Sequence, residues 1–137
     1  MKSNHAALSL AFSAALFSAL PACAQALKSG EEVYKRVCFA CHAEGVANAP
    51  KFGDKAKWAP LLKEGQVQPT AHGWVGVRGM PPKGGREDLK LEEFARAAAY
   101  MARTAGGKWQ DPDAGMMKRI EAEVKRRIEA DKKKAKK

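Results

Sequence analysis

The chain has 137 residues, of which 25 are Lys or Arg and 15 are Asp or Glu, so its formal net charge is +10. A chain of this length is expected to form one domain, which excludes a multidomain enzyme with its own mobile lid. Apolar residues make up 45% of the sequence. A domain this small buries a limited core, so we expect a bound group to complete it.

Residues 1–26 have the composition of a secretory leader. Lys2 is the only Lys, Arg, Asp or Glu among them, a mostly apolar run covers 6–20, and small residues at 22–26 suit cleavage after Ala24 or Ala26. The apolar run is shorter than the roughly 20 residues that a membrane-spanning helix needs. We therefore expect cleavage and export to the periplasm. An uncleaved anchor and a lipoprotein acylated at Cys23 are the alternatives.

Cys38 and Cys41 remain once the leader is removed, and His42 follows them directly. In an oxidising compartment two thiols need a partner or each other. Two cysteines separated by two residues and followed by histidine are typical of c-type haem attachment. A disulfide or a thioredoxin-like redox pair is the alternative, although it leaves His42 without a role. The motif predicts one covalent haem c, with His42 as an iron ligand.

The second axial ligand is expected to be Met80. It stands before two prolines and a pair of glycines, which restrict the backbone and allow a tight return, so this loop can hold one side chain still. Met101, Met116 and Met117 fall in helical patterns, where methionine usually packs. His72 is a further candidate, although a surface or hydrogen-bonding role suits a lone histidine better.

Two N-terminal segments carry helix signals. Ser29, with a glutamate three residues later, forms a capping box for a helix that runs to about Val37. A shorter helix follows the cap Asp54, is limited by Pro60 and closes at Gly65.

The segment 91–103 has the clearest helical pattern. Phe94, Ala97, Ala98 and Met101 share one face, and glycines at 106 and 107 stop the helix. Alternating runs of strand length are absent from the sequence. The pattern predicts an all-α protein.

These stretches together resemble a small bacterial class I cytochrome c of the cytochrome c-five group. The matching stretches are 30–42 with the haem motif, 49–54, Trp58, 80–85 and 99–101. The resemblance covers about residues 28–105. It implies a compact all-α fold of three to four helices around one haem, and an electron-carrier role.

The resemblance also implies particular contacts. A proline carbonyl after the haem motif accepts the Nδ1 proton of the ligand histidine, which indicates Pro50. The N-terminal helix crosses the C-terminal helix, setting Gly30 and Val33 against Phe94, Ala97 and Tyr100. Two features depart from the group. The cysteine pair that many members carry after the methionine loop is absent, and Gly73 stands where alanine is common and would loosen its helix.

Trp58 and Arg78 have two interpretations each. The Trp58 indole packs in the core or directs its N–H to a haem propionate. Arg78 is a surface charge or a propionate partner.

With His42 and Met80 both on the iron, no coordination position is open. The protein is then expected to shuttle single electrons in a respiratory chain, with neither enzyme activity nor a small-molecule substrate. A haem subunit docked in a larger oxidoreductase is an alternative. A haem sensor or peroxidase is another, if Met80 does not bind. A thiol-disulfide oxidoreductase is the third.

Charge indicates the partners. Lys51, Lys83 and Arg86 flank the haem motifs and would steer redox proteins with acidic docking surfaces. We expect residues 27–107 to form the haem domain and 108–137 a basic helical tail. Within the tail Met117, Ile120, Val124 and Ile128 form a narrow apolar stripe among basic residues. The tail suits an anionic membrane surface, an acidic partner or packing on its own domain. Nucleic acid is not expected as a partner after export.

Overall fold

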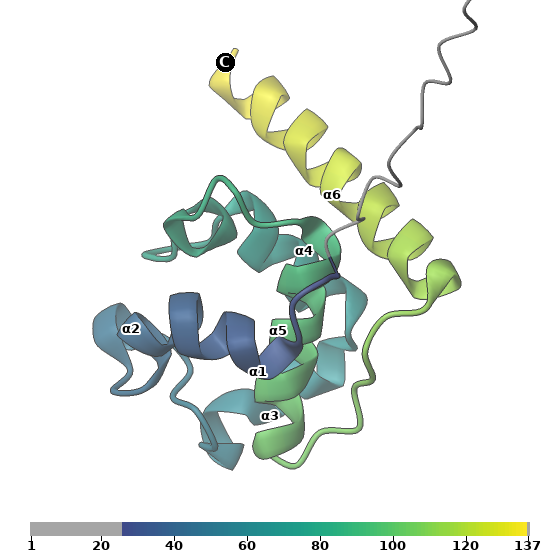
Figure 1. Ribbon diagram of the computed structural model, residues 1–137. Coiled ribbons are helices and arrows are strands. Elements are labelled where there is room, and N and C mark those ends of the chain that lie inside the picture. Colours follow the sequence, from purple (N-terminus) through teal and green to yellow (C-terminus); the bar gives the residue numbers. More distant parts are fainter. Residues whose placement is uncertain (1–25, 137) are drawn as a thin grey trace, which may run out of the picture.

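The computed structural model describes residues 26–136, which Figure 1 shows as a set of helices. The predicted leader, apart from Ala26, and Cys23 lie outside the described residues. Within residues 26–136 the only β-pairing is an isolated bridge between Val77 and Met80. None of the helices in this range is long and apolar enough to cross a bilayer. The all-α prediction is confirmed.

The N-terminal helical segment has three consecutive parts: α1 (Gly30–Val33), the π-helical turn η1 (Tyr34–Cys38) and α2 (Phe39–His42). It begins with the predicted capping box, in which the Glu32 backbone N–H donates to Ser29 Oγ at 3.2 Å and the Ser29 N–H donates to Glu32 Oε2 at 2.8 Å. The expected end near Val37 is wrong, because the π turn carries the helix on into the haem motif.

The helix α3 (Lys55–Glu64) begins at Asp54, whose Oδ1 accepts the Lys57 N–H at 3.0 Å. The prediction that Pro60 limits this helix is wrong, since Pro60 lies inside it. A proline inside a helix leaves the carbonyl four residues earlier without its donor. Both Pro60 and Ala56, which carries that carbonyl, are exposed, so water can satisfy it. Gly65 ends α3 with φ 82°, as predicted.

The helix α5 (Leu91–Thr104) crosses α1, as Figure 1 shows. The crossing is close because Gly30 has no side chain, and a Cβ there would overlap the Arg96 carbonyl and lie 3.0 Å from Tyr100 Cβ. Val33, Phe94 and Ala97 belong to one buried cluster at this crossing. The crossing that the resemblance implied is therefore present.

A buried carboxylate joins the start of the chain to α5. Glu93 is 2% exposed and accepts the backbone N–H of Lys28 at 3.0 Å and that of Lys90 at 3.2 Å. Lys28 Nζ lies 3.3 Å from the same carboxylate. These contacts fix the approach to α1 before its first turn.

The remaining elements are η2 (Val46–Asn48), α4 (Val67–Val75), η3 (Pro82–Gly85) and α6 (Ala114–Ala135). The long helix α6 lies along one side of the other helices in Figure 1. Its Ile120 and Val124 are buried in a second cluster with Ala71 of α4 and Ala95 of α5. The apolar stripe predicted in the tail therefore packs on the chain's own domain, except for Ile128, which is 40% exposed.

Candidate haem site

His42 ends α2 and is 7% exposed. Its Nδ1–H donates to the Pro50 carbonyl at 2.9 Å, which is the contact that the resemblance implied. The His42 carbonyl accepts the Phe52 N–H at 2.7 Å, which ties the loop to α2. With the proton on Nδ1, Nε2 keeps a lone pair that can bind a metal.

A cavity of about 300 Å³ lies beside His42 and is lined by every helical element from η1 to α5. Much of its wall is apolar, and the larger side chains there are Val37, Trp58, Leu61, Phe94, Met101 and Trp109. Such a wall excludes water and accepts a flat apolar group.

Both cysteines of the motif line this cavity as free thiols. Cys38 is 6% exposed, and burial raises the pKa of its thiol to about 12. Cys41 is exposed. Thiol-disulfide exchange needs a thiolate near neutral pH. A buried thiol that stays protonated makes Cys38 a poor attacking nucleophile for such exchange.

Met80 reaches the cavity from a tight turn. The Val77 N–H donates to the Met80 carbonyl at 3.0 Å, and the Met80 N–H donates to the Val77 carbonyl at 2.9 Å. Arg78, inside this turn, has φ 52°. The Gly84 N–H then donates to the Pro81 carbonyl at 3.1 Å. Backbone hydrogen bonds thus hold Met80 on both sides, an arrangement that proline and glycine content alone did not reveal.

Gly73 lies where α4 meets Met80. A Cβ there would lie 2.8 Å from Phe94 Cζ and 3.4 Å from Met80 Cε. The expectation that Gly73 loosens its helix did not take this contact into account. Glycine at this position makes room for the Phe94 ring. That ring also meets Trp74 edge to face at 5.7 Å between centroids.

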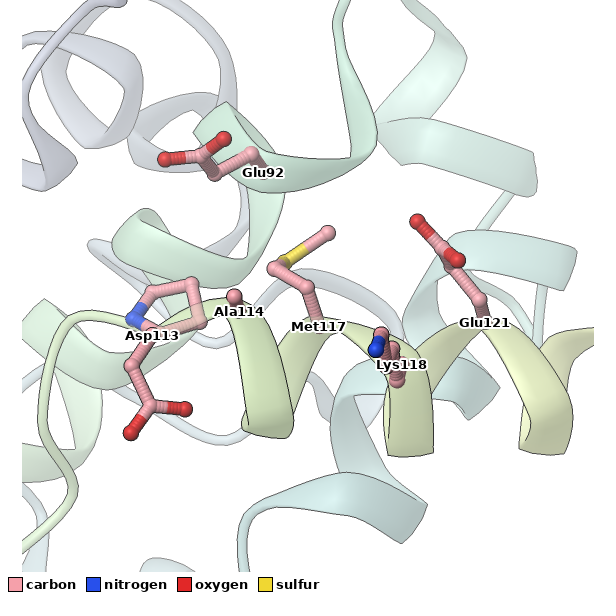
Figure 2. Close-up of a pocket in the computed structure, with 7 residues that line it drawn as sticks. Glu92, Asp113, Ala114, Met117, Lys118 and Glu121 are labelled. Atoms are coloured by element: carbon pink, nitrogen blue, oxygen red, sulfur yellow. The ribbon is translucent and has the colours of Figure 1, made fainter.

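The structure places two of the four other candidate ligands away from the haem cavity. Met117 lies in a different cleft, of about 520 Å³, where α6 meets Glu92 at the start of α5 (Figure 2). Met116 packs in the second buried cluster. Met101 and His72 do line the haem cavity. Burial, followed by the charge of Arg127 on α6, lowers the pKa of His72. The position of His72 in the cavity wall was missed by sequence reasoning, because a lone histidine carries no local signal.

Trp58 and Arg78 both line the cavity. Trp58 is 3% exposed and donates its Nε1–H to the Lys51 carbonyl at 3.1 Å, so its one donor is already used. This favours the packing interpretation over a propionate contact. Arg78 is exposed at the rim.

The three cations expected to steer partners each have an acidic neighbour. Lys51 pairs with Glu44 at 3.4 Å, Lys83 with Glu87 at 3.0 Å and Arg86 with Asp88 at 2.9 Å. Their combined field at the cavity is therefore weaker than the sequence indicated.

This set of residues fits haem c. Two thiols one helical turn apart, an imidazole with an available Nε2 and a thioether meet at one apolar cavity. These are the groups by which cytochromes c attach haem and bind its iron.

Comparisons with known proteins agree with this geometry. Residues 25–101 match the family described as cytochrome c oxidase, cbb3-type, subunit III. Cytochrome c-555 of Chlorobaculum tepidum is 40% identical over 77 residues, covering 53% of this chain and 71% of that protein. Cytochrome c5 of Azotobacter vinelandii is 38% identical over 77 residues, covering 55% and 93%.

A solved structure is also similar. It is described as an electron transfer complex of nitrite reductase with cytochrome c, and the matching chain is 43% identical with a TM-score of 0.55. The match covers 58% of this chain and 99% of that one. Residues 102–137 lie outside the matched family segment, so α6 is an addition to the shared fold.

Proposed function

Because this chain belongs to the cytochrome c family and so is an electron-transfer protein with covalent haem c, we propose that His42 and Met80 are its axial iron ligands. Cys38 and Cys41 would form the thioether bonds. The observation that carries the proposal is that all four side chains meet at one apolar cavity. Haem c supplies an iron that takes up and releases one electron.

The residues of the chain perform three tasks at this site. The Pro50 carbonyl keeps a proton on Nδ1 of His42, which leaves Nε2 free to bind the haem iron. The turn at Val77 fixes Met80. The apolar wall excludes water, which favours the reduced, less charged state. With His42 and Met80 both bound to the iron, no position would remain there for a substrate.

The expected partners are redox proteins with acidic surfaces, met in the periplasm after removal of residues 1–26. The mouth of the cavity includes the exposed side chains of Val46 and Pro81 with Arg78 beside them. Apolar contact with a nearby positive charge suits brief docking. The nitrite reductase complex of the similar cytochrome supports a redox protein as the partner. The basic tail adds a second charged surface, suited to an anionic membrane.

The ligation is tested by absorption spectra of the protein made with a haem-attachment system. We expect a c-type spectrum, a weak far-red band from the ferric methionine bond, and no change when carbon monoxide is added to the reduced protein. Met80→Ala should lose the far-red band completely and bind carbon monoxide. Met117→Ala is the matched control and should leave both properties unchanged, because Met117 lies in the other cleft.

A wild-type protein that lacks the band and binds carbon monoxide would contradict methionine ligation. It would favour a haem sensor or peroxidase.

A haem subunit of a larger oxidoreductase is the second candidate, because the matching family is described as an oxidase subunit. A stable complex that survives moderate salt would favour it over a diffusing carrier. Isolation of the haem protein alone under the same salt would favour the carrier.

We further propose that the haem domain extends beyond the expected boundary at 107. Trp109 is 8% exposed and meets Trp58 edge to face at 6.3 Å between centroids. Gln110 forms two hydrogen bonds with the Gln66 side chain, at 2.6 and 3.2 Å. The tail would then begin after Pro112.

A further inference from the structure

The inward face of α6 is already occupied. Ile120 is fully buried and Val124 is 7% exposed, and both pack in the cluster that holds Ala71 of α4. An amphipathic helix binds a bilayer by inserting its apolar face. That face is not available here, so any membrane contact of α6 must come from its outward side.

The outward side of α6 carries basic residues in a seven-residue repeat. The repeated pairs are Lys118 with Arg119, Lys125 with Arg126, and Lys132 with Lys133. All six are exposed. Seven residues are close to two helical turns, so the pairs form two parallel rows with steps of about 10 Å. We call these six residues the basic rows.

Much of this charge is not neutralised by other residues in the range 26–136. Arg126 pairs with Glu123 and Lys132 with Glu129. In the part of the chain that the structure describes, Lys118, Arg119, Lys125 and Lys133 form no ion pair. A helix of 22 residues is about 33 Å long, so the basic rows form an extended, nearly straight positive surface.

The helix α4 separates the basic rows from the haem cavity. Pro69, His72 and Gly73 of α4 line the cavity. Val67, Ala71 and Val75, on its opposite face, pack in the cluster with α6. Figure 1 shows α6 along the outer side of α4, with α2 on the other side of the domain. A surface bound by the basic rows would therefore leave the cavity mouth accessible.

We infer that the basic rows of α6 bind an anionic lipid bilayer and hold the haem domain there with its cavity mouth accessible to redox partners. This deepens the proposed function, on which the second half of the inference rests. The basic rows have no aromatic or apolar anchor, and lysine is depleted at protein interfaces. Lysines at a bilayer surface act additively through charge and need no shaped partner. A lipid surface therefore fits better than an acidic protein.

The test is co-sedimentation of the holoprotein with two kinds of vesicle. We expect binding to vesicles containing phosphatidylglycerol, its loss in high salt, and none to pure phosphatidylcholine. The variant K118Q/R119Q/K125Q/K133Q should bind at least about a hundred-fold more weakly, since each cation near the surface contributes separately. The control K55Q/K57Q/K63Q/K108Q removes four exposed cations elsewhere. Its affinity for the vesicles should fall only by about two-fold relative to the wild type, through the lower net charge.

Equal losses in the two variants, or no binding by the wild type, would overturn the inference. Binding to immobilised polyglutamate without binding to anionic vesicles would overturn it in favour of an acidic protein partner. The haem spectrum of the same samples tests the axial ligands separately, so the two proposals fail independently. A soluble neutral quinol should reduce the vesicle-bound protein at a rate within about two-fold of the rate for the free protein. A blocked reaction would overturn the accessible orientation.

Discussion

Single residues at this site act through contacts as much as through chemistry. His42 and Met80 are the proposed ligands, yet the Pro50 carbonyl and the Val77 backbone hold them in place. Gly73 contributes by having no side chain. Two predictions concern residues that would never touch the iron.

Gly73→Ala should destabilise the protein and disturb Met80. A Cβ at 2.8 Å from Phe94 Cζ forces the ring or α4 to move, and overpacking of this kind costs about 1–3 kcal/mol. Denaturant unfolding of the ferric protein and the intensity of the far-red band measure the two effects. Gly115→Ala is the control. It lies in an exposed turn of α6 and should be neutral or stabilising by about 0.5–1 kcal/mol. Unchanged unfolding of Gly73→Ala would contradict the packing described.

Glu93→Gln should alter the pH dependence of stability. Burial opposes ionisation, but the N–H groups of Lys28 and Lys90 and the Lys28 ammonium hold the pKa of Glu93 below its ordinary 4.5. The resulting stabilisation is therefore present above about pH 4.5 and is lost as pH falls through the folded-state pKa. We expect the variant to lose about 1–3 kcal/mol at pH 7 and to be less sensitive to acid.

Unfolding curves of Glu93→Gln between neutral and acidic pH check this. Glu121→Gln, exposed on α6, serves as the comparison and should match the wild type. If Glu93→Gln and the wild type lost stability in parallel below pH 4.5, the carboxylate would have no such role.

At the scale of elements, local signals were read correctly more often than long-range ones. The cap at Ser29 and the stop at Gly106 depend on neighbours in sequence, and each is found where it was predicted. Two features depend on which face of a helix meets water or another helix. They are the position of Pro60 inside α3 and the packing of α6 on α4. Spacing alone does not determine that choice.

The docking of α6 gives a matched pair of substitutions. Ile120 is fully buried and Ile128 is 40% exposed on the same helix. Ile120→Ala should cost about 2–5 kcal/mol, because it removes buried methyl groups and leaves a cavity. Ile128→Ala should change the free energy of unfolding by less than about 0.5 kcal/mol. Denaturant titration of both variants measures the difference. Equal values would mean that α6 is not packed on α4.

At the scale of the whole molecule, the haem domain and its added helix are distinct in kind. The matched family segment ends at residue 101, and the cavity is complete without α6. The buried Trp109 nevertheless lies beyond that segment and beyond the boundary expected at 107. The tryptophan was missed because a lone aromatic residue after a helix gives no sign of what it will pack against.

Two truncated chains test where the domain ends. A chain ending after Pro112 should keep the c-type spectrum with the far-red band. A chain ending after residue 107 also loses Trp109, and removal of a buried tryptophan costs about 3–5 kcal/mol. It should therefore unfold at lower denaturant than the longer chain. Indistinguishable midpoints would return the boundary to 107.

The π turn at Tyr34–Cys38 has a consequence for the angular phase of the N-terminal helix. Val33 before the turn faces α5, while His42 after it faces the cavity. Consecutive residues of an α-helix are about 100° apart, and a π turn accommodates one extra residue in its hydrogen-bonded loop. Removing one residue here would rotate the haem motif relative to the α5 contact. The turn therefore sets the phase between two faces that must both be satisfied. It also takes part in both, since the Tyr34 ring lies 5.7 Å from the Tyr100 ring of α5 and Val37 and Cys38 line the cavity.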